Sequence, residues 1–219
     1  PDPPVPLICT IHDVIPLIYP RSVRNPFLRS RYKARLLQAL RQASCVITVS
    51  QISLSTLSVY AGVDLARVRV IHNGVSDQFH PVTDEEALAD VRTTYALPEW
   101  YAFWIGEFRP HKNLTLLLDA WQALQERLPH PLPLVLAGPQ EAAFRATKAV
   151  ARKRGLRDLV HFPGYIRNRD LPAVYSGAAV FVFPSLYEGF GLPPLEAMAC
   201  GTPCVVSNSS ALPEVTGSA

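Results

Sequence analysis

Acidic residues are missing from one long stretch of this sequence, and charge is sparse throughout. No Asp or Glu occurs from Val14 to Val63, and charged residues make up only 18% of the chain. The net charge of +3 is too small to indicate a nucleic-acid partner, which requires a much stronger basic balance. No run approaches ~18 uninterrupted apolar residues, and no signal peptide is visible. We therefore expect a cytoplasmic protein without a membrane span.

Cysteines and glycine-rich motifs are also few. The cysteines lack the close paired spacing of a zinc site, and the nearest pair is Cys200 and Cys204. We expect them to be small buried residues in a reducing compartment. No expected strand is followed by G-x-G-x-x-G, which disfavours a dinucleotide dehydrogenase. Hydrophobic residues nevertheless make up 48% of the chain, which is ample for a core.

The stretch without acids is expected to contain a basic helix at residues 29–43. Its spacing places Tyr32, Leu36 and Leu40 on one face. The cations of this stretch are Arg21, Arg24, Arg29, Arg31, Lys33, Arg35 and Arg41. A basic face can rest on anionic lipid headgroups or attract a phosphate-bearing acceptor, at ~1 kcal/mol for each basic residue near an anionic surface. The alternative is an ordinary solvated helix face.

Short apolar runs alternate with helical patterns along the chain. Strands are expected at residues 7–11, 45–49, 68–72, 100–105, 134–137, 160–163, 180–183 and 204–207. Helices are expected at 29–43, 50–60, 84–94, 113–128, 140–154, 170–176 and 193–200. Apolar strands that alternate with helices indicate parallel sheets covered on both faces. The expected fold class is therefore α/β, with a Rossmann-like second half.

The stretch 180–214 holds the most informative pattern. It reads as an apolar strand, a loop with Glu188, Gly189 and Gly191, and a helix that begins near two prolines. Proline suits a first helical turn and glycine allows close backbone approach, so this junction is a plausible anion site. Glu188 and Glu196 flank the junction, and carboxylates accept hydrogen bonds from neutral hydroxyls rather than from phosphate. The pattern predicts a ligand that carries phosphate and hydroxyls together.

The sequence E-G-F-G-L-P-P-L-E, followed by A-C-G-T-P-C-V-V-S, resembles the Glu-x7-Glu signature of retaining GT-B glycosyltransferases of family 4. The resemblance implies two Rossmann-like domains whose parallel sheets face each other across a cleft. The stretch H-N-G-V-S-D-Q-F-H-P resembles the family's inter-domain linker. We place an acceptor-side domain at 1–76 and a donor-binding domain at 77–219. Compared with the family, the first domain is incomplete and the second is truncated, so we expect a fragment.

The resemblance also implies which residues hold the nucleotide-sugar donor. The segment G-E-F-R-P-H-K-N is similar to the family's G-x-x-x-P-x-K-N, in which an arginine and the lysine grip the donor diphosphate. Arg109 and Lys112 would take these roles. Many members carry the arginine directly after the glycine, where this chain has Glu107. By the same resemblance, Glu196 would accept the ribose hydroxyls and Glu188 the hexose hydroxyls.

Further positions complete the implied site. The His-Asp pair that begins at His12 resembles the family's pair at the cleft, where the histidine approaches the donor sugar; the alternative is a purely structural pair. His12 and Glu188 are the expected catalytic residues. Gly138 ends a strand near the nucleotide, and Tyr165 and Ile166 would seat the base, partly through backbone groups. The donor-binding loop further contains Gly189, Phe190, Gly191 and Leu192.

The implied activity is transfer of a hexosyl group, most consistent with mannosyl, from a nucleotide-diphosphate sugar to a glycan or lipid-linked acceptor with retention of configuration. The chain contains no Asp-x-Asp, which argues against a divalent ion on the diphosphate. We therefore expect no metal and no cofactor beyond the donor as co-substrate. The basic helix 29–43 would permit peripheral contact with an anionic membrane. Two alternatives stay open, a GT-B-shaped nucleotide-sugar epimerase and a non-catalytic nucleotide-sugar-binding protein.

Overall fold

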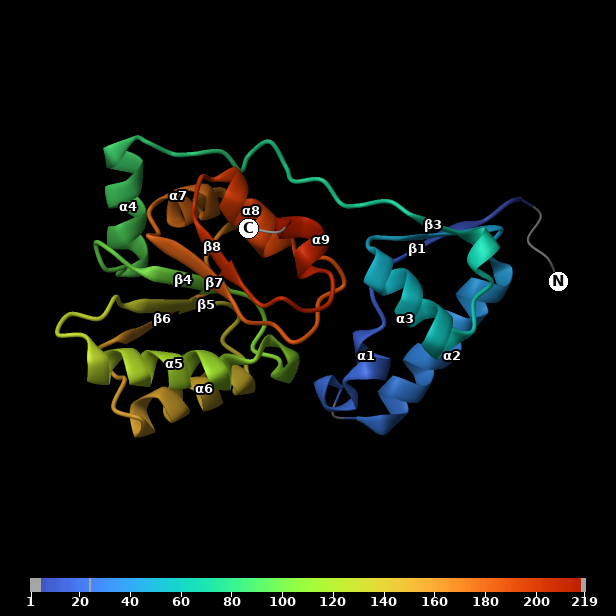
Figure 1. Ribbon diagram of the computed structural model, residues 1–219, viewed down its shortest axis with the longest axis horizontal. Helices are drawn as coiled ribbons and strands as arrows, with labels where there is room; N and C mark the ends of the chain where they lie inside the picture. Colours follow the sequence, from blue (N-terminus) through green and yellow to red (C-terminus); the bar gives the residue numbers. More distant parts are fainter. Residues whose placement is uncertain (1–4, 24, 218–219) are drawn as a thin grey trace. The chain divides into compact units, whose positions relative to one another are not determined.

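The computed structural model describes residues 5–23 and 25–217 (Figure 1). In this described part, the chain divides into two compact units. The first unit comprises Pro1–Gly74, Leu186–Gly191 and Asn208–Ala219, and the second comprises Val75–Ser185 and Leu192–Ser207. Two short segments from the end of the chain thus belong to the unit that is built mainly from its beginning. Arg24, one of the expected cations, lies outside the described residues.

The first unit is built on a parallel sheet of order β1-β2-β3. Its strands are β1 (Ile8–Ile11), β2 (Cys45–Thr48) and β3 (Val68–Val70). Its helices are α1 (Ile15–Ile18), α2 (Pro26–Gln42), α3 (Gln51–Ala61) and α9 (Leu212–Thr216), with short 3-10 turns at Pro20–Ser22 and Leu65–Arg67. Leu36 and Leu40 of α2 and Leu57 of α3 are buried in one cluster with Val46 of β2. The apolar stripe predicted for the basic helix is therefore its core-facing side.

The second unit contains a parallel sheet of order β6-β5-β4-β7-β8. Its strands are β4 (Ala102–Ile105), β5 (Leu134–Ala137), β6 (Val160–Gly164), β7 (Val180–Phe183) and β8 (Cys204–Val206). Its helices are α4 (Glu85–Tyr95), α5 (Leu114–Arg127), α6 (Ala142–Lys153), α7 (Leu171–Ser176) and α8 (Leu192–Ala199), with 3-10 turns at Pro110–Lys112 and Asn168–Asp170. In Figure 1, α5 and α6 lie along one side of this sheet and α4, α7 and α8 along the other. Helices on both faces of a parallel sheet are the arrangement of a doubly wound fold.

The α/β class and its parallel strands are confirmed. Each expected strand appears with its bounds shifted by at most a few residues, and each expected helix is present. Helix α2 begins at Pro26 rather than near residue 29, because proline is pre-shaped for the first turn and the Asn25 side chain accepts a hydrogen bond from the Phe27 amide at 2.9 Å. The short helices α1 and α9 were not expected.

An aromatic cluster forms the centre of the second unit. Phe103 of β4 packs edge-on against Tyr175 of α7, with ring centroids 5.3 Å apart, and Phe181 of β7 lies 5.5 Å from Tyr175. Phe79, which precedes α4, contacts the same tyrosine ring at 6.0 Å. Edge-to-face contacts of this kind each contribute about 0.5–1.5 kcal/mol beyond burial. The cluster holds Tyr175 in a fixed orientation.

Two further properties concern a membrane span and the reactivity of the thiols. No helix within residues 5–23 and 25–217 is both long and apolar enough to cross a lipid bilayer. Burial raises the pKa of the Cys200 and Cys204 thiols to about 11 each. Both side chains are therefore protonated, weakly nucleophilic groups at neutral pH.

Candidate functional site

The strand order of the second unit defines where a ligand is expected. The chain runs from β4 outward to β5 and β6, then returns to β7 on the other side of β4. In open parallel sheets, ligands bind outside the carboxyl ends of the strands at this point of reversal. The reversal lies between β4, which ends at Ile105, and β7, which ends at Phe183.

Lys112 lies at this reversal. It ends the 3-10 turn that follows β4, and its Nζ is 5.1 Å from the ring centroid of Phe183, the last residue of β7. The cation–π contact contributes about 0.5–1 kcal/mol and holds the ammonium group beside the strand ends. Arg109, from the same loop, forms an ion pair with Glu107 at 2.8 Å, and both side chains are largely exposed. Lys112 is thus the better-placed cation.

The ends of three neighbouring strands are tied together by backbone bonds. The Gly106 amide donates to the Ala137 carbonyl at 3.1 Å, and the Gly138 amide donates to the Gly164 carbonyl at 2.8 Å. A Cβ atom at Gly138 would stand 2.0 Å from the Gly106 carbonyl oxygen, so no other residue fits without a backbone shift. Gly138, identified above at a strand end, is required for this close approach of two loops.

The position assigned to the base follows β6. The Tyr165 side chain is 62% exposed and its hydroxyl donates a long hydrogen bond of 3.4 Å to Asn168. Ile166 is buried, with only 1% of its surface exposed. Only the tyrosine ring is thus available to stack on a ligand, and Ile166 contributes through its backbone and packing.

Glu196 lies on α8 of the second unit and accepts a hydrogen bond from the Tyr175 hydroxyl at 2.8 Å. Burial raises the pKa of Glu196, and the Tyr175 hydrogen bond partly offsets that effect. Burial, together with the adjacent carboxylate, raises the pKa of Tyr175 well above its usual value, so the phenol stays protonated and donates. The arrangement presents a partly buried carboxylate, held by one donor, to further hydroxyl donors.

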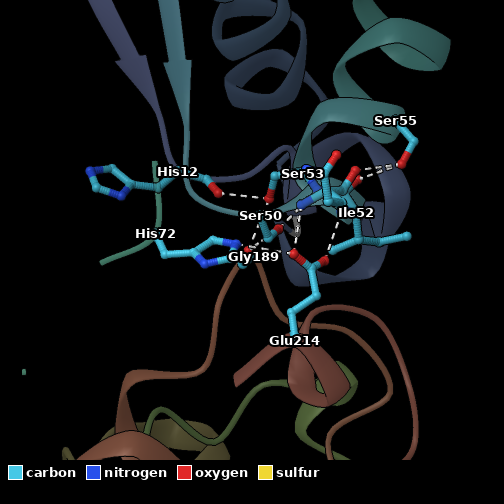
Figure 2. A network of polar contacts seen from close by, with 9 residues as sticks. His12, Ser50, Ile52, Ser53, Ser55, His72, Gly189 and Glu214 are labelled. Carbon is cyan, nitrogen blue, oxygen red and sulfur yellow. Dashed lines mark hydrogen bonds and ion pairs between the residues drawn. The ribbon is translucent and has the colours of Figure 1, made fainter. Parts of the chain in front are cut away.

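The loop Leu186–Gly191 belongs to the first unit, where it contacts the start of α3 (Figure 2). The Gly189 carbonyl accepts hydrogen bonds from the Ser50 hydroxyl at 2.7 Å and the Ser53 hydroxyl at 3.0 Å. Ser53 also donates to the His12 carbonyl at 3.1 Å, although one hydroxyl proton serves one of these acceptors at a time. A Cβ atom at Gly189 would approach that carbonyl oxygen to 2.6 Å, so glycine is required here.

The imidazole of His12 does not take part in this network. Its side chain is exposed, and Figure 2 shows it pointing away from Ser50 and Ser53. The structure therefore places the backbone of His12 against the loop and leaves its ring at the surface of the first unit. The neighbouring Asp13 carboxylate accepts a hydrogen bond from the Ile15 amide at 2.8 Å, which begins α1.

Glu214 of α9 forms the second half of the same network (Figure 2). Its two carboxylate oxygens accept hydrogen bonds from the Gln51 amide at 2.8 Å and the Ile52 amide at 3.1 Å. A carboxylate at a helix N-terminus is favourable because it satisfies unpaired amides and complements the helix dipole. The Nε2 atom of His72 lies 3.4 Å from the Oε2 atom of Glu214. The His72 ring also packs at a tilt against the Phe190 ring, with ring centroids 5.8 Å apart.

The remaining residues of the predicted donor loop fall into both units. Glu188 is buried, with 8% of its surface exposed, and its amide donates to the Ser210 hydroxyl at 2.8 Å. Phe190 is equally buried, and Gly191 ends the segment that belongs to the first unit. Leu192 begins α8 in the second unit and is 40% exposed. The two glutamates of the motif thus belong to different units.

Comparison with known families decides the classification. The family model described as Glycosyl transferases group 1 matches residues 92–219, which is more than half of the chain. A second model, described as Glycosyltransferase Family 4, matches residues 2–79. The chain belongs to the glycosyl transferases group 1 family.

Relatives of this group 1 chain include several mannosyltransferases. It is 34% identical over 214 residues to the serotype-specific mannosyltransferase WbdA of Escherichia coli, covering 96% of this chain and 26% of WbdA. It is 33% identical to O-antigen chain mannosyltransferase B of Escherichia coli over 97% of this chain and 55% of that protein. The chain therefore spans about a quarter to about half of the length of these relatives.

Solved structures establish the fold of the group 1 chain. The crystal structure of Anabaena HepE in complex with UDP and glucose matches with a TM-score of 0.75 at 23% identity, covering 95% of this chain and 55% of that one. The fold is that of GT-B glycosyltransferases, and this chain spans about half of such a structure.

Three residues of these networks were not identified as site residues from the sequence. Tyr175 gave no signal, because a tyrosine in a short apolar helix is ordinarily a core residue. Ser53 and Glu214 bond to groups more than a hundred positions away, which no local pattern encodes. Ser50 begins the segment expected as a helix at 50–60, and its hydroxyl caps α3 by accepting from the Ser53 amide at 3.0 Å. Within the described ranges, no group of three or more His, Cys, Asp or Glu side chains is placed to hold a metal ion.

Replacing Ser50 by alanine is expected to destabilise the first unit by about 2 kcal/mol, because both the helix cap and the bond to the Gly189 carbonyl are lost. Ser55→Ala is the matched control, since this exposed hydroxyl bonds only carbonyls of its own helix. Urea unfolding of both variants measures the difference. Equal midpoints for the two variants would show that the contact with the loop contributes nothing.

Proposed function

We propose that this protein transfers a mannosyl group from a nucleotide-diphosphate sugar to a glycan or lipid-linked acceptor, with retention of configuration and without a metal ion. The observation that carries the proposal is the position of Lys112 at the strand reversal of a group 1 glycosyltransferase fold. The choice of mannose is supported by mannosyltransferase relatives that are 33–34% identical over nearly the whole chain.

The proposed roles follow from the chemistry of each group. As the bond between the sugar and the diphosphate breaks, negative charge grows on the leaving phosphate, and the Lys112 ammonium group stabilises it. Arg109 joins it only if it exchanges its ion pair with Glu107 for the diphosphate. Glu196 accepts hydrogen bonds from the ribose hydroxyls, and the Tyr165 ring stacks on the base.

For the loop Leu186–Gly191 of the first unit, the proposed role is binding of the donor hexose. Glu188 accepts hydrogen bonds from hydroxyls of the donor hexose, in the loop formed with Gly189, Phe190 and Gly191. His12 approaches the same sugar. We do not assign Glu188 the role of nucleophile, which one of two carboxylates about 5 Å apart takes in retaining hydrolases. The backbone contacts of Gly189 with Ser50 and Ser53 give this loop a defined conformation.

The test is a transfer assay on the complete protein with labelled GDP-mannose, UDP-glucose, UDP-N-acetylglucosamine and ADP-glucose, each with and without a chelator. We expect transfer from GDP-mannose that persists with the chelator, and an α-linked product by NMR. Transfer that vanishes with the chelator and returns with magnesium or manganese would contradict metal independence. Conversion of the donor sugar without any acceptor would identify an epimerase, and nucleotide binding without turnover would identify a non-catalytic binder.

We also infer peripheral contact of α2 with anionic membrane. The helix presents Phe27 and Leu28, which are 71% and 51% exposed, at its first turn, next to exposed cations such as Arg31 and Arg35. Exposed apolar residues beside basic ones are typical of surfaces that enter the headgroup region. Co-sedimentation with vesicles of phosphatidylcholine, with and without phosphatidylglycerol, tests this contact. Equal binding to both vesicle types would contradict it.

A further inference from the structure

A pocket in the first unit lies outside the residues assigned to the donor. Its volume is about 400 Å³. The lining residues are Leu17 of α1, Pro20 of the 3-10 turn that follows, Arg29, Ser30 and Lys33 of α2, and Tyr60 of α3. Three of these side chains therefore come from the first two turns of α2. The others come from α1, from the turn that follows it, and from the last turn of α3.

The two charged residues that line this pocket are both cations. Arg29 and Lys33 are four positions apart on α2, so their charges face the same side of the helix and repel each other. Within the described residues, neither side chain has an ion-pair or hydrogen-bond partner. The absence of Asp and Glu from residues 14–63 removes the local carboxylates that would otherwise neutralise them. An anion in the pocket would relieve this repulsion.

The other lining groups fit an ester of phosphate better than a bare ion. Ser30 and Tyr60 provide hydroxyls that donate to phosphate oxygens or exchange hydrogen bonds with a polyol. Arg29 presents a planar fork that suits phosphate, and Lys33 adds a point charge. Leu17 and Pro20 form an apolar wall against which the carbon skeleton of a ligand can pack.

The pocket is structurally connected to the end of β1. The Tyr32 hydroxyl, which lies between the two cations in sequence, donates to the Asp13 carbonyl at 3.0 Å. Burial raises the pKa of Tyr32 to about 12, so it remains a donor at physiological pH. Asp13 in turn begins α1, which carries Leu17 into the pocket wall. The pocket therefore lies beside the segment that carries His12.

We propose that this pocket binds the phosphate group of a phosphate-bearing acceptor. Its identification with the acceptor, rather than with an unrelated ligand, rests on the proposed transferase function. The phosphate sits between Arg29 and Lys33, and the attached sugar or lipid portion lies against Leu17 and Pro20.

Isothermal titration of inorganic pyrophosphate into the complete protein, with its donor site saturated by GDP, tests this pocket. The double variant Arg29→Gln/Lys33→Gln is expected to bind at least ~10-fold more weakly, because it loses two charge-assisted contacts. The double variant Arg152→Gln/Lys153→Gln removes the same charge from exposed positions of α6, outside the pocket, and is expected to bind like the native protein. Ser30→Asp, which adds a negative charge inside the pocket, is expected to abolish binding. Equal weakening by both double variants, or by neither, would overturn the proposal.

Two further measurements follow. The first distinguishes a free phosphate ester from a lipid headgroup as the ligand, and the second distinguishes failure of the pocket proposal from failure of the proposed transferase function. Phosphatidylglycerol vesicles are titrated with the same variants. If the pocket variant loses affinity for pyrophosphate but not for vesicles, the pocket binds a free phosphate ester. If it loses more affinity for vesicles than its control does, the pocket binds a lipid-borne phosphate. Thermal shift with GDP is expected to be unchanged in the pocket variant. Pyrophosphate binding that depends on Arg29 and Lys33 in a protein that transfers no sugar would sustain the pocket as an anion site and end its assignment to an acceptor.

Discussion

Alanine at Lys112 is expected to lower sugar transfer by the complete protein at least ~100-fold. The ammonium group lies at the strand reversal of the second unit, beside the ring of Phe183, where the diphosphate of a bound nucleotide sugar is expected. An oriented donor that meets developing charge in a site of low dielectric contributes about 3 kcal/mol to the transition state, and its loss falls mainly on kcat. Lys112→Arg keeps the charge but changes its geometry, so we expect partial activity.

Lys148 provides the control for this experiment. Its Nζ lies 5.8 Å from the ring centroid of Phe162, so Lys148→Ala also removes a half-buried cation–π contact from the second unit. Lys148 is on α6, away from the ends of β4 and β7. Both variants are expected to lose similar thermal stability, but only the first is expected to lose transfer. Near-normal transfer by Lys112→Ala, or an equal loss in both variants, would remove Lys112 from the donor site.

The parts of the fold that were predictable are those encoded by neighbouring residues. The apolar runs at Leu134–Ala137 and Val180–Phe183 are buried strands because both lie between neighbouring strands of the sheet and are covered on both faces. Lys112 was proposed from sequence because a short motif fixes both its loop and the strand before it. Helix α1 was missed because a helix of one turn, with a proline at its second position, has no periodicity to detect.

Interactions between distant segments were not predictable in the same way. Ser50 reads as a helix cap from its local sequence, and it is one. That its hydroxyl also donates to Gly189, 139 positions later, depends on the packing of the loop in the first unit. Glu214 looks like an ordinary residue near a proline, yet it satisfies the first amides of α3. A hydrophobic pattern predicts which face of a helix or strand is buried. It does not predict which distant polar group will form hydrogen bonds with that element.

The motif itself shows what the structure adds. From sequence, Glu188 and Glu196 are two acids at one loop-to-helix junction. In the structure, Glu188 belongs to a segment of the first unit, and Glu196 lies on a helix of the second unit against Tyr175. The nine residues therefore connect two separately packed bodies. Mutations at the two acids are accordingly expected to differ in their structural consequences, even if both reduce transfer.

Glutamine at Glu196 is expected to reduce transfer at least ~100-fold while raising the stability of the folded protein at neutral pH. The loss of transfer follows from the proposed role, because a neutral amide replaces a charge-assisted acceptor of the ribose hydroxyls. The gain in stability follows from the raised pKa of Glu196, whose principal cause is burial. The native state holds this proton to higher pH than the unfolded chain does, so folding stability declines as pH rises from the ordinary pKa through the raised one. Glutamine removes that penalty and still accepts the Tyr175 hydroxyl.

The measurement is the difference in melting temperature between Glu196→Gln and the native protein as a function of pH, together with transfer kinetics. The difference is expected to be positive above the raised pKa and to vanish below the ordinary value near 4.5, where both states are protonated. Glu214→Gln is the contrasting variant, because its carboxylate caps α3 and its loss is expected to be destabilising. Tyr175→Phe is expected to weaken transfer less than Glu196→Gln, since it removes the positioning bond and keeps the carboxylate. A variant Glu196→Gln that is destabilised at neutral pH and transfers normally would refute both the burial penalty and the role in binding the donor.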